Sequence, residues 1–193
     1  MIATRRRTSC VFLSLLTTLV ATQLAAAPPA SERVAAQREA MAALDDWAGE
    51  WAGEGWAWIG PGRKHTFTME ETVAPRLQGL VLLIEGQGMS EDPETGEMVV
   101  SHDALAIVDF DPDAGNYRLH HHTMDGRSGV ADLHRTASGL RWGFRDAQRD
   151  GEIRFTITLE DDRWHEVGEF SRDGGETWLQ FLEMELERVR GHI

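Results

Sequence analysis

The feature that most constrains the fold is the string Gly49-Glu50-Trp51-Ala52-Gly53-Glu54-Gly55. Alternate residues of a strand point to the same face, so Trp51 is followed on its face by two glycines that carry no side chain. Such a strand can coil tightly, because glycine tolerates the bend of a barrel corner and leaves room for a neighbouring backbone. Interior glycines would each cost a helix roughly 1 kcal/mol relative to alanine. The string therefore predicts a strongly coiled strand.

After this string the sequence consists of short alternating runs broken by turn residues, which is typical of an all-β sandwich or barrel. Short turns such as Asp125-Gly126 and Asp150-Gly151 make neighbours in sequence neighbours in space. An antiparallel meander of this length leaves free edges unless it closes, so a single up-and-down barrel is favoured. We predict ten strands, near 49–59, 63–74, 77–89, 98–110, 116–124, 127–136, 139–146, 151–160, 163–172 and 176–189.

The chain resembles the lipocalin-like (calycin) β-barrels, in particular the nitrobindin-type haem barrels and a related family of secreted bacterial domains of unknown function. The shared marks are the Gly49–Gly55 opening, the Glu70-Glu71 pair, the Leu77-Gln-Gly-Leu80 turn and a tryptophan-containing last strand that ends in arginine. The resemblance extends over most of 45–190. It implies that Arg188 or Arg190 covers Trp51 at the closed end through a cation–π contact.

Residues 1–27 have the order of a secretory signal peptide. Three arginines at 5–7 precede the apolar run Val11–Ala21, and small residues follow at Ala25–Ala27. The apolar run is too short to span a bilayer comfortably. We therefore expect cleavage near Ala27 and an exported protein, periplasmic or extracellular, with no stable membrane insertion.

One helical pattern precedes the strands, over 31–46. Ser31 is placed to cap it, and Val34, Met41 and Leu44 form a narrow apolar stripe. The segment either packs against one end of the barrel or forms a flexible lead. The predicted organisation is thus a cleaved signal peptide (1–27), a lead with one helix (28–46) and one barrel domain (47–193).

Composition limits the partners. The chain carries 32 acidic and 19 basic residues and a formal charge of −13. This balance argues against nucleic acid or an anionic membrane surface as a partner. Cys10, the single cysteine, lies in the predicted signal peptide, so the mature protein would have neither a disulfide nor a thiolate ligand.

Two acidic motifs are interpreted as structural turns. Ser171-Arg-Asp-Gly-Gly-Glu-Thr-Trp178 fits the S-x-D-x-G-x-T-W pattern of an Asp box, in which the aspartate accepts backbone N–H groups. The run from Asp109 to Gly115 is superficially a calcium loop, but its glycine is one residue late and Pro112 stiffens it. A solvated hairpin is favoured there.

Histidines provide the strongest metal candidate. Arg118, His120 and His122 share one strand face, and the turns on either side predict the register of the neighbouring strands. That register places Asp132 opposite His120, with His134 next on the same face of its strand. Zinc or another imidazole-preferring metal is therefore a candidate for binding there. A register slip of one residue would turn the whole set outward. The opposite face is at least as good a core face, so a surface band of His, Arg and Asp is the alternative. The residues of that face are Leu105, Ile107, Leu119 and Leu133. The metal candidates are His120, His122, Asp132 and His134.

The resemblance also raises haem, because nitrobindin-type barrels carry an axial histidine on the last strand. Here that strand has no histidine, although Met184 lies on it and His192 is nearly terminal. No cofactor is therefore the first expectation, with zinc or haem as alternatives.

The first hypothesis for function is a monomeric or weakly dimeric exported barrel that binds a small apolar or amphipathic molecule in its cavity. Two alternatives stay open: a metal- or haem-dependent enzyme using the histidine cluster or a C-terminal ligand, and a structural envelope protein with a filled barrel. Glu70 and Glu71 are consecutive in a strand, so they face opposite sides. The predicted ligand-contacting residues are Trp51, Glu70, Arg118, Arg141 and Trp142.

Overall fold

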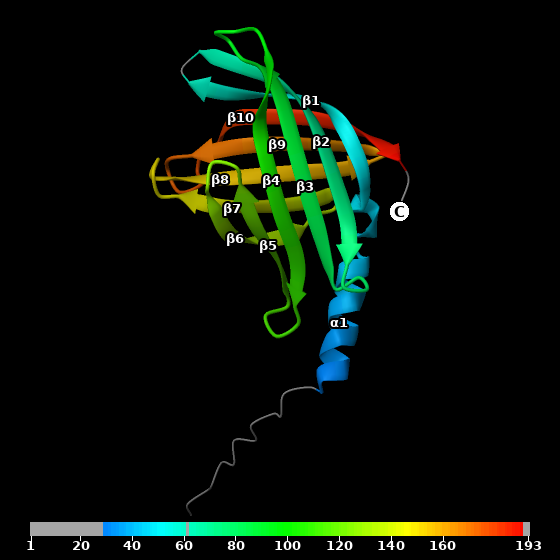
Figure 1. Cartoon of the computed structure of the whole chain (residues 1–193). Coiled ribbons are helices and arrows are strands. Elements are labelled where there is room, and N and C mark those ends of the chain that lie inside the picture. The colour runs from blue at the N-terminus through cyan, green and yellow to red at the C-terminus, as the bar shows by residue number, and fades with distance from the viewer. Residues whose placement is uncertain (1–28, 61, 191–193) are drawn as a thin grey trace, which may run out of the picture.

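The computed structural model describes residues 29–60 and 62–190, so the predicted signal peptide, Cys10 and His192 lie outside the described residues. The chain forms a closed antiparallel barrel in which each strand pairs with its neighbours in sequence and β1 pairs with β10 (Figure 1). This confirms the predicted fold class. The elements are α1 (Ala30–Ala42), η1 (Asp45–Trp47), β1 (Gly49–Gly60), β2 (Arg63–Arg76), β3 (Val81–Glu91), β4 (Met98–Asp111), β5 (Asn116–Thr123), β6 (Ser128–Arg135), β7 (Gly139–Asp146), β8 (Gly151–Glu160), β9 (Arg163–Ser171) and β10 (Leu179–Arg190).

The turns form where turn residues stand in the sequence. In the turn before β5, the Asp111 carboxylate accepts the backbone N–H groups of Asp113 and Ala114, and Gly115 has a φ of 70°. A left-handed φ of this size favours glycine. The acidic run is therefore a hairpin held by its own aspartate, as predicted.

The barrel closes where β1 bends against β10. Trp51 pairs with Arg188 and Gly53 pairs with Leu186 across this seam. A Cβ atom at Gly53 would lie 2.0 Å from the carbonyl oxygen of Glu185, so the close approach of the two backbones requires glycine. The Gly49–Gly55 string thus sets the curvature on which closure depends.

The core is densest at the end of the barrel where the chain enters it. The Trp47 and Trp51 rings meet the Trp164 ring edge to face, at centroid distances of 5.4 and 5.7 Å. All three side chains are 2% exposed. Trp51 Nε1 also donates to the Trp47 carbonyl oxygen at 3.0 Å. This cluster brings three aromatic side chains into the core at that end, and aromatic side chains dominate core energetics.

Helix α1 packs against this same end, beside the lower ends of β2 and β4 in Figure 1. Gln37 donates to the Leu80 carbonyl oxygen, and the Tyr117 hydroxyl donates to the Ala40 carbonyl oxygen. Met41 and Leu44 are buried. The helix differs from prediction in its bounds: it begins at Ala30 after Pro29 without a side-chain cap, so the predicted Ser31 cap is wrong. Among the described residues, no helix has the length and apolar character needed to cross a membrane.

The Asp box is a structural hairpin, as predicted. Asp173 accepts hydrogen bonds from the backbone N–H and the hydroxyl of Thr177, and Trp178 Nε1 donates to the Gly175 carbonyl oxygen at 3.0 Å. The Arg154 guanidinium lies 3.9 Å from the Trp178 ring centroid. The motif therefore fixes the turn between β9 and β10.

Candidate functional site

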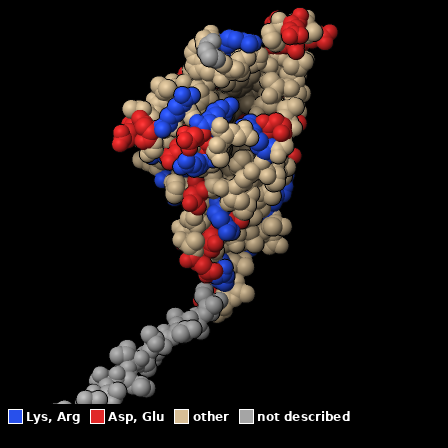
Figure 2. All heavy atoms as spheres, turned by 90° about the vertical axis from the view of Figure 1, so that its left-hand side faces the viewer, with Lys and Arg blue, Asp and Glu red and all other residues tan. Residues whose placement is uncertain are grey.

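A recess opens into the barrel at the end opposite α1. Turns alternate between the two ends of an antiparallel barrel, and α1 contacts the turns before β3 and β5, so the turns before β2, β4, β6, β8 and β10 frame the other end. The pairing of β6 with β7 runs only from Arg135 and Leu140 to Leu133 and Trp142, so these two strands are unpaired with each other toward that end. Interior side chains near that end are partly exposed. They define the recess: Phe67, His102, His121, Trp142, Phe144 and Phe155. Figure 2 faces this end and shows a hollow near the top of the molecule.

One wall of the recess is aromatic. Trp142 on β7 pairs with Phe155 on β8, and the two rings stack at a centroid distance of 4.4 Å and an interplanar angle of 17°. The Phe144 ring lies 6.1 Å from Trp142, and the Phe181 ring meets Phe155 edge to face at 5.8 Å. Rings that stay partly exposed inside a barrel present apolar surface that a ligand can bury.

Two histidines face the recess from the other wall. The His121 ring lies 5.6 Å from the Phe144 ring and directly over Gly129, where a Cβ atom would be 2.8 Å from Nε2. His102 pairs with Gly88 across β3 and β4. Burial lowers the pKa of both imidazoles. The Asp103 and Asp125 charges oppose this effect on His102, whereas the His122 and Arg127 charges lower the pKa of His121 further. Both rings are therefore neutral at neutral pH and can donate or accept a hydrogen bond.

Two carboxyl groups lie deeper in the interior. Glu71 on β2 stands between Trp51 and Gly86 in the sheet, and Glu166 on β9 accepts a hydrogen bond from Trp164 Nε1 at 3.0 Å. Burial, with a smaller contribution from the Glu166 charge, raises the pKa of Glu71 to about 8. Burial raises the pKa of Glu166 to about 7, although the Trp164 hydrogen bond acts in the opposite direction. Carboxyl groups with raised pKa values inside a cleft mark a candidate functional site.

The structure separates the predicted ligand-contacting residues. Trp142 lines the recess, and Trp51 is buried beneath Arg188 at the closed end. Arg118 lies on the outer face and pairs with Asp109 at 3.0 Å. Glu70 and Arg141 are exposed on the outer face as well. The predicted opposition of Glu70 and Glu71 is confirmed, and the interior member of the pair is Glu71.

The predicted metal cluster does not assemble. His120, His122, Asp132 and His134 lie on the outer face of β5 and β6, where Asp132 pairs with Arg118 and His120 pairs with Val130. The His120 ring is 3.4 Å from Asp109, and Asp132 accepts from Asn116 at 2.7 Å. The predicted register between β5 and β6 was wrong by two residues. Asp132 and His134 therefore lie farther along β6 from the histidines of β5 than predicted. Within the described residues, no group of three or more His, Cys, Asp or Glu side chains is placed to hold a metal ion.

Trp56 and Trp58 face outward from the half of β1 that lies toward the open end, because they alternate with the inward-facing Trp51, Gly53 and Gly55. The Trp56 ring is covered by Lys64 at 3.8 Å, and its Nε1 donates to Glu183 at 3.1 Å. Trp58 remains 44% exposed. These two rings belong to the outer surface and are not part of the recess.

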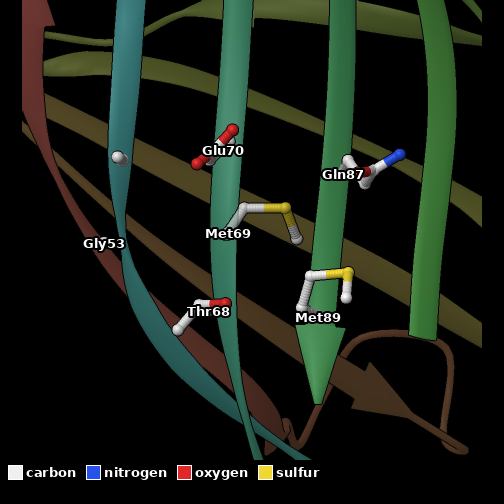
Figure 3. Close-up of a pocket in the computed structure, with 7 residues that line it drawn as sticks. Gly53, Thr68, Met69, Glu70, Gln87 and Met89 are labelled. Atoms are coloured by element: carbon white, nitrogen blue, oxygen red, sulfur yellow. The ribbon is translucent and has the colours of Figure 1, made fainter. Parts of the chain in front are cut away.

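Two further hollows lie outside the recess. One, of about 380 Å³, is lined mainly by outward positions of β1, β2 and β3 (Figure 3): Ala52, Gly53, Thr68, Met69, Glu70, Gln87 and Met89. The other, of about 220 Å³, lies where η1 meets the turn between β6 and β7. The first has Glu70 and Gln87 exposed at its rim and the second is framed by turn residues, so neither combines buried polar groups with an apolar wall as the recess does.

Sequence reasoning missed the interior polar residues. Glu71 follows Phe67 and Met69 and precedes Val73 at the same parity, and Glu166 follows Trp164 in the same way. An acidic residue at an apolar position of a strand was the available signal, because such a residue faces the core. His121 was hidden by its neighbours, since three consecutive histidines leave parity unable to choose a face.

The geometry defines a closed ten-stranded antiparallel barrel with an aromatic recess at one end. No family model and no curated protein matches the sequence. Among solved structures, the chain is similar to the crystal structure of Rv2717c from M. tuberculosis, with a TM-score of 0.56 and 16% sequence identity over 78% of this chain and 98% of that one. At this identity the similarity concerns the fold alone.

Proposed function

We propose that this protein is an exported lipocalin-like barrel that binds a small apolar or amphipathic molecule in the recess. The observation that carries the proposal is the stacked pair Trp142 and Phe155, which is only partly buried although it faces the inside of a closed barrel. Covering such a pair removes apolar surface from water, and each square ångström contributes about 25 cal/mol. The similarity to another barrel structure supports the architecture.

The end opposite the recess is sealed, which supports binding from one side. The Trp47, Trp51 and Trp164 cluster fills that end, and α1 packs outside it. A ligand pocket combines an apolar lining with a few polar groups that orient the ligand. His102 and His121 provide neutral polar groups beside the aromatic wall.

Binding of the neutral dye N-phenyl-1-naphthylamine tests the proposal. We expect its fluorescence to rise in the presence of the protein and the tryptophan emission to be quenched. Replacement of Trp142 by alanine should weaken dye binding about tenfold or more. Trp58→Ala, on the outer surface, is the matched control and should leave binding unchanged. No dye binding by the folded wild-type protein would favour the filled structural barrel instead.

Export is the second part of the proposal, and it is supported by the arginine, apolar and small-residue order of residues 1–27. The partner expected in that compartment is a small molecule, with the barrel acting as a monomer or weak homodimer. Mass spectrometry of the protein recovered from a periplasmic or culture fraction tests this. Loss of about the first 27 residues is expected, and an intact N-terminus in the cytoplasm would contradict it.

A second candidate function is haem binding, and the neutral imidazoles of His102 and His121 favour it. An imidazole beside stacked aromatic rings is a suitable axial ligand for a planar iron porphyrin. Met184, on β10, is buried among the core residues. Titration with hemin tests this candidate: a Soret band that changes in His121→Ala but not in His122→Ala supports it. These two adjacent residues face opposite sides of β5, so the second is a matched control.

A further inference from the structure

The interior of the barrel contains two acidic side chains that the fold itself does not require. Glu71 makes no hydrogen bond or ion pair with the described residues, and its carboxyl group lies against Gly86, with Oε1 2.5 Å from the place where a Cβ atom of that residue would stand. Glu166 is 6% exposed and has one partner, Trp164, on one of its two oxygens. Neither carboxyl group counts among the fully buried side-chain atoms that lack a partner, so their free oxygens reach accessible space and can accept a hydrogen bond from a ligand.

Small residues line the wall from Glu71 toward the open end. Glu71 pairs with Gly86, Gly86 pairs with Ala104, and Ala104 pairs with Thr123 at the end of β5. Because directly paired positions share a face of the sheet, these side chains all point inward. The row runs from the carboxyl group to the edge of the recess without a large side chain. The aromatic wall of β7 and β8 stands on the other side.

The charges of the interior favour a cation over an anion. Arg188 is the basic side chain that packs within the barrel, and it is already held by Asp162 and by the carbonyl oxygens of Asp46 and Ala48. The side chains that define the recess include neither lysine nor arginine, so an anionic head group would find no cationic side chain among them. The formal charge of −13 also attracts cations toward the molecule.

We propose that the recess binds an organic amine, whose apolar part packs against Trp142 and Phe155 and whose ammonium group is held between Glu71 and Glu166. This inference rests on the function proposed above and names the chemical class of the ligand. When no cation is present, Glu71 is mostly protonated and Glu166 partly protonated at neutral pH, because burial raises the pKa of Glu71 to about 8 and that of Glu166 to about 7. An arriving ammonium replaces those protons, so binding releases protons to the solvent.

The experiment compares three ligands with the same hydrocarbon chain: octylamine, octanol and octanoate. Each displaces the naphthylamine dye, and calorimetry in buffers of different ionisation enthalpy counts the protons released. We expect octylamine to bind at least about tenfold more tightly than octanol or octanoate, with proton release. The double variant Glu71→Gln, Glu166→Gln should lose this preference and the proton release while retaining octanol binding. Glu70→Gln, one residue away on the outer face, is the matched control.

The outcomes separate this inference from the proposed function. Octanol and dye binding without an advantage for octylamine would overturn the amine assignment and leave the apolar recess intact. Tighter binding of octanoate would overturn it in favour of protonated carboxyl groups that donate to the ligand. If neither the dye nor any of the three octyl ligands binds the folded wild-type protein, both proposals are overturned. Glutamine is uncharged and similar in shape, so the double variant removes the buried charge without opening a cavity.

Discussion

The guanidinium carbon of Arg188 lies 4.1 Å from the centroid of the Trp51 ring, and the two residues are direct partners across the β1–β10 seam. The contact joins the last strand to the first at the point where the barrel closes. Arg188 also donates to Asp162 and to the carbonyl oxygens of Ala48 and Asp46. One side chain therefore ties together β1, β10, η1 and the turn before β9.

Replacement of Arg188 by alanine should lower the free energy of unfolding by roughly 2 to 3 kcal/mol, because a cation–π contact and several charge-assisted hydrogen bonds are lost together. Arg188→Lys should recover only part of this, since an ammonium group can lie over the ring but does not bridge the carbonyl oxygens. Urea denaturation measures both. Arg163→Ala, in a surface ion pair of 3.9 Å with Glu187, is the control and should have little effect.

Replacement of Gly53 by alanine should prevent normal closure of the barrel. The new methyl group would meet the Glu185 carbonyl oxygen and the Leu186 Cα atom, which are backbone atoms that cannot move aside. We expect a loss of about 3 kcal/mol or more in unfolding free energy. Gly60→Ala provides a comparison, because no described atom lies within 4 Å of its Cβ position. A Gly53→Ala protein as stable as the wild type would contradict the close packing of the seam.

Replacement of Glu71 by glutamine should stabilise the protein in a pH-dependent way. The pKa of this carboxyl group is raised from 4.5 to about 8, so the folded state holds its proton over a range in which the unfolded state has lost it. Stability from this group is therefore full below about pH 4.5 and declines as pH rises to about 8. At higher pH we expect the variant to be more stable than the wild type by roughly 2 to 4 kcal/mol.

Thermal or urea unfolding of the two proteins across this pH range measures the difference, which should disappear toward pH 4.5. Glu70→Gln, which changes an exposed carboxylate on the same strand, should show no such trend. A stability difference that does not change with pH would mean that Glu71 is not buried as described.

For the Asp box we predict a stability that changes with pH in the opposite direction. Hydrogen bonds from the Thr177 hydroxyl and backbone N–H lower the pKa of Asp173 from 3.8 to about 2. A lowered pKa means that the stabilising contribution is present above pH 3.8 and is lost as pH falls through about 2. Asp173→Ala should therefore lower Tm at neutral pH, and the difference should shrink at about pH 2. Asp161→Ala is the comparison, because Asp161 is an aspartate in the tight turn before β9 and does not belong to an Asp box.

The strands were predictable because local chemistry marks both their ends. Asp111 and Gly115 fix one turn through the aspartate hydrogen bonds and a left-handed glycine, and similar signals stand at most other breaks. The closure of β1 on β10 followed from the glycines after Trp51 and from the cost of free sheet edges. The contact of Arg188 with Trp51 confirms what the resemblance implied, with Arg188 as the residue involved.

The site was less predictable, because it depends on which face of each strand points inward. On β4 the outward positions include Leu105 and Ile107, which are 38% and 39% exposed. Both faces of that strand therefore look apolar, and the interior small residues Ala104 and Ala106 carry little signal. On β5 the two-residue error in pairing moved Asp132 from Arg118 to His120 and created a cluster that the fold does not contain.

Because α1 and the tryptophan cluster close one end of the barrel, a ligand bound in the recess as proposed would enter and leave on the side away from α1. The turns around the opening would then limit how fast the ligand exchanges, whereas the closed end would limit how deeply its head group enters the barrel.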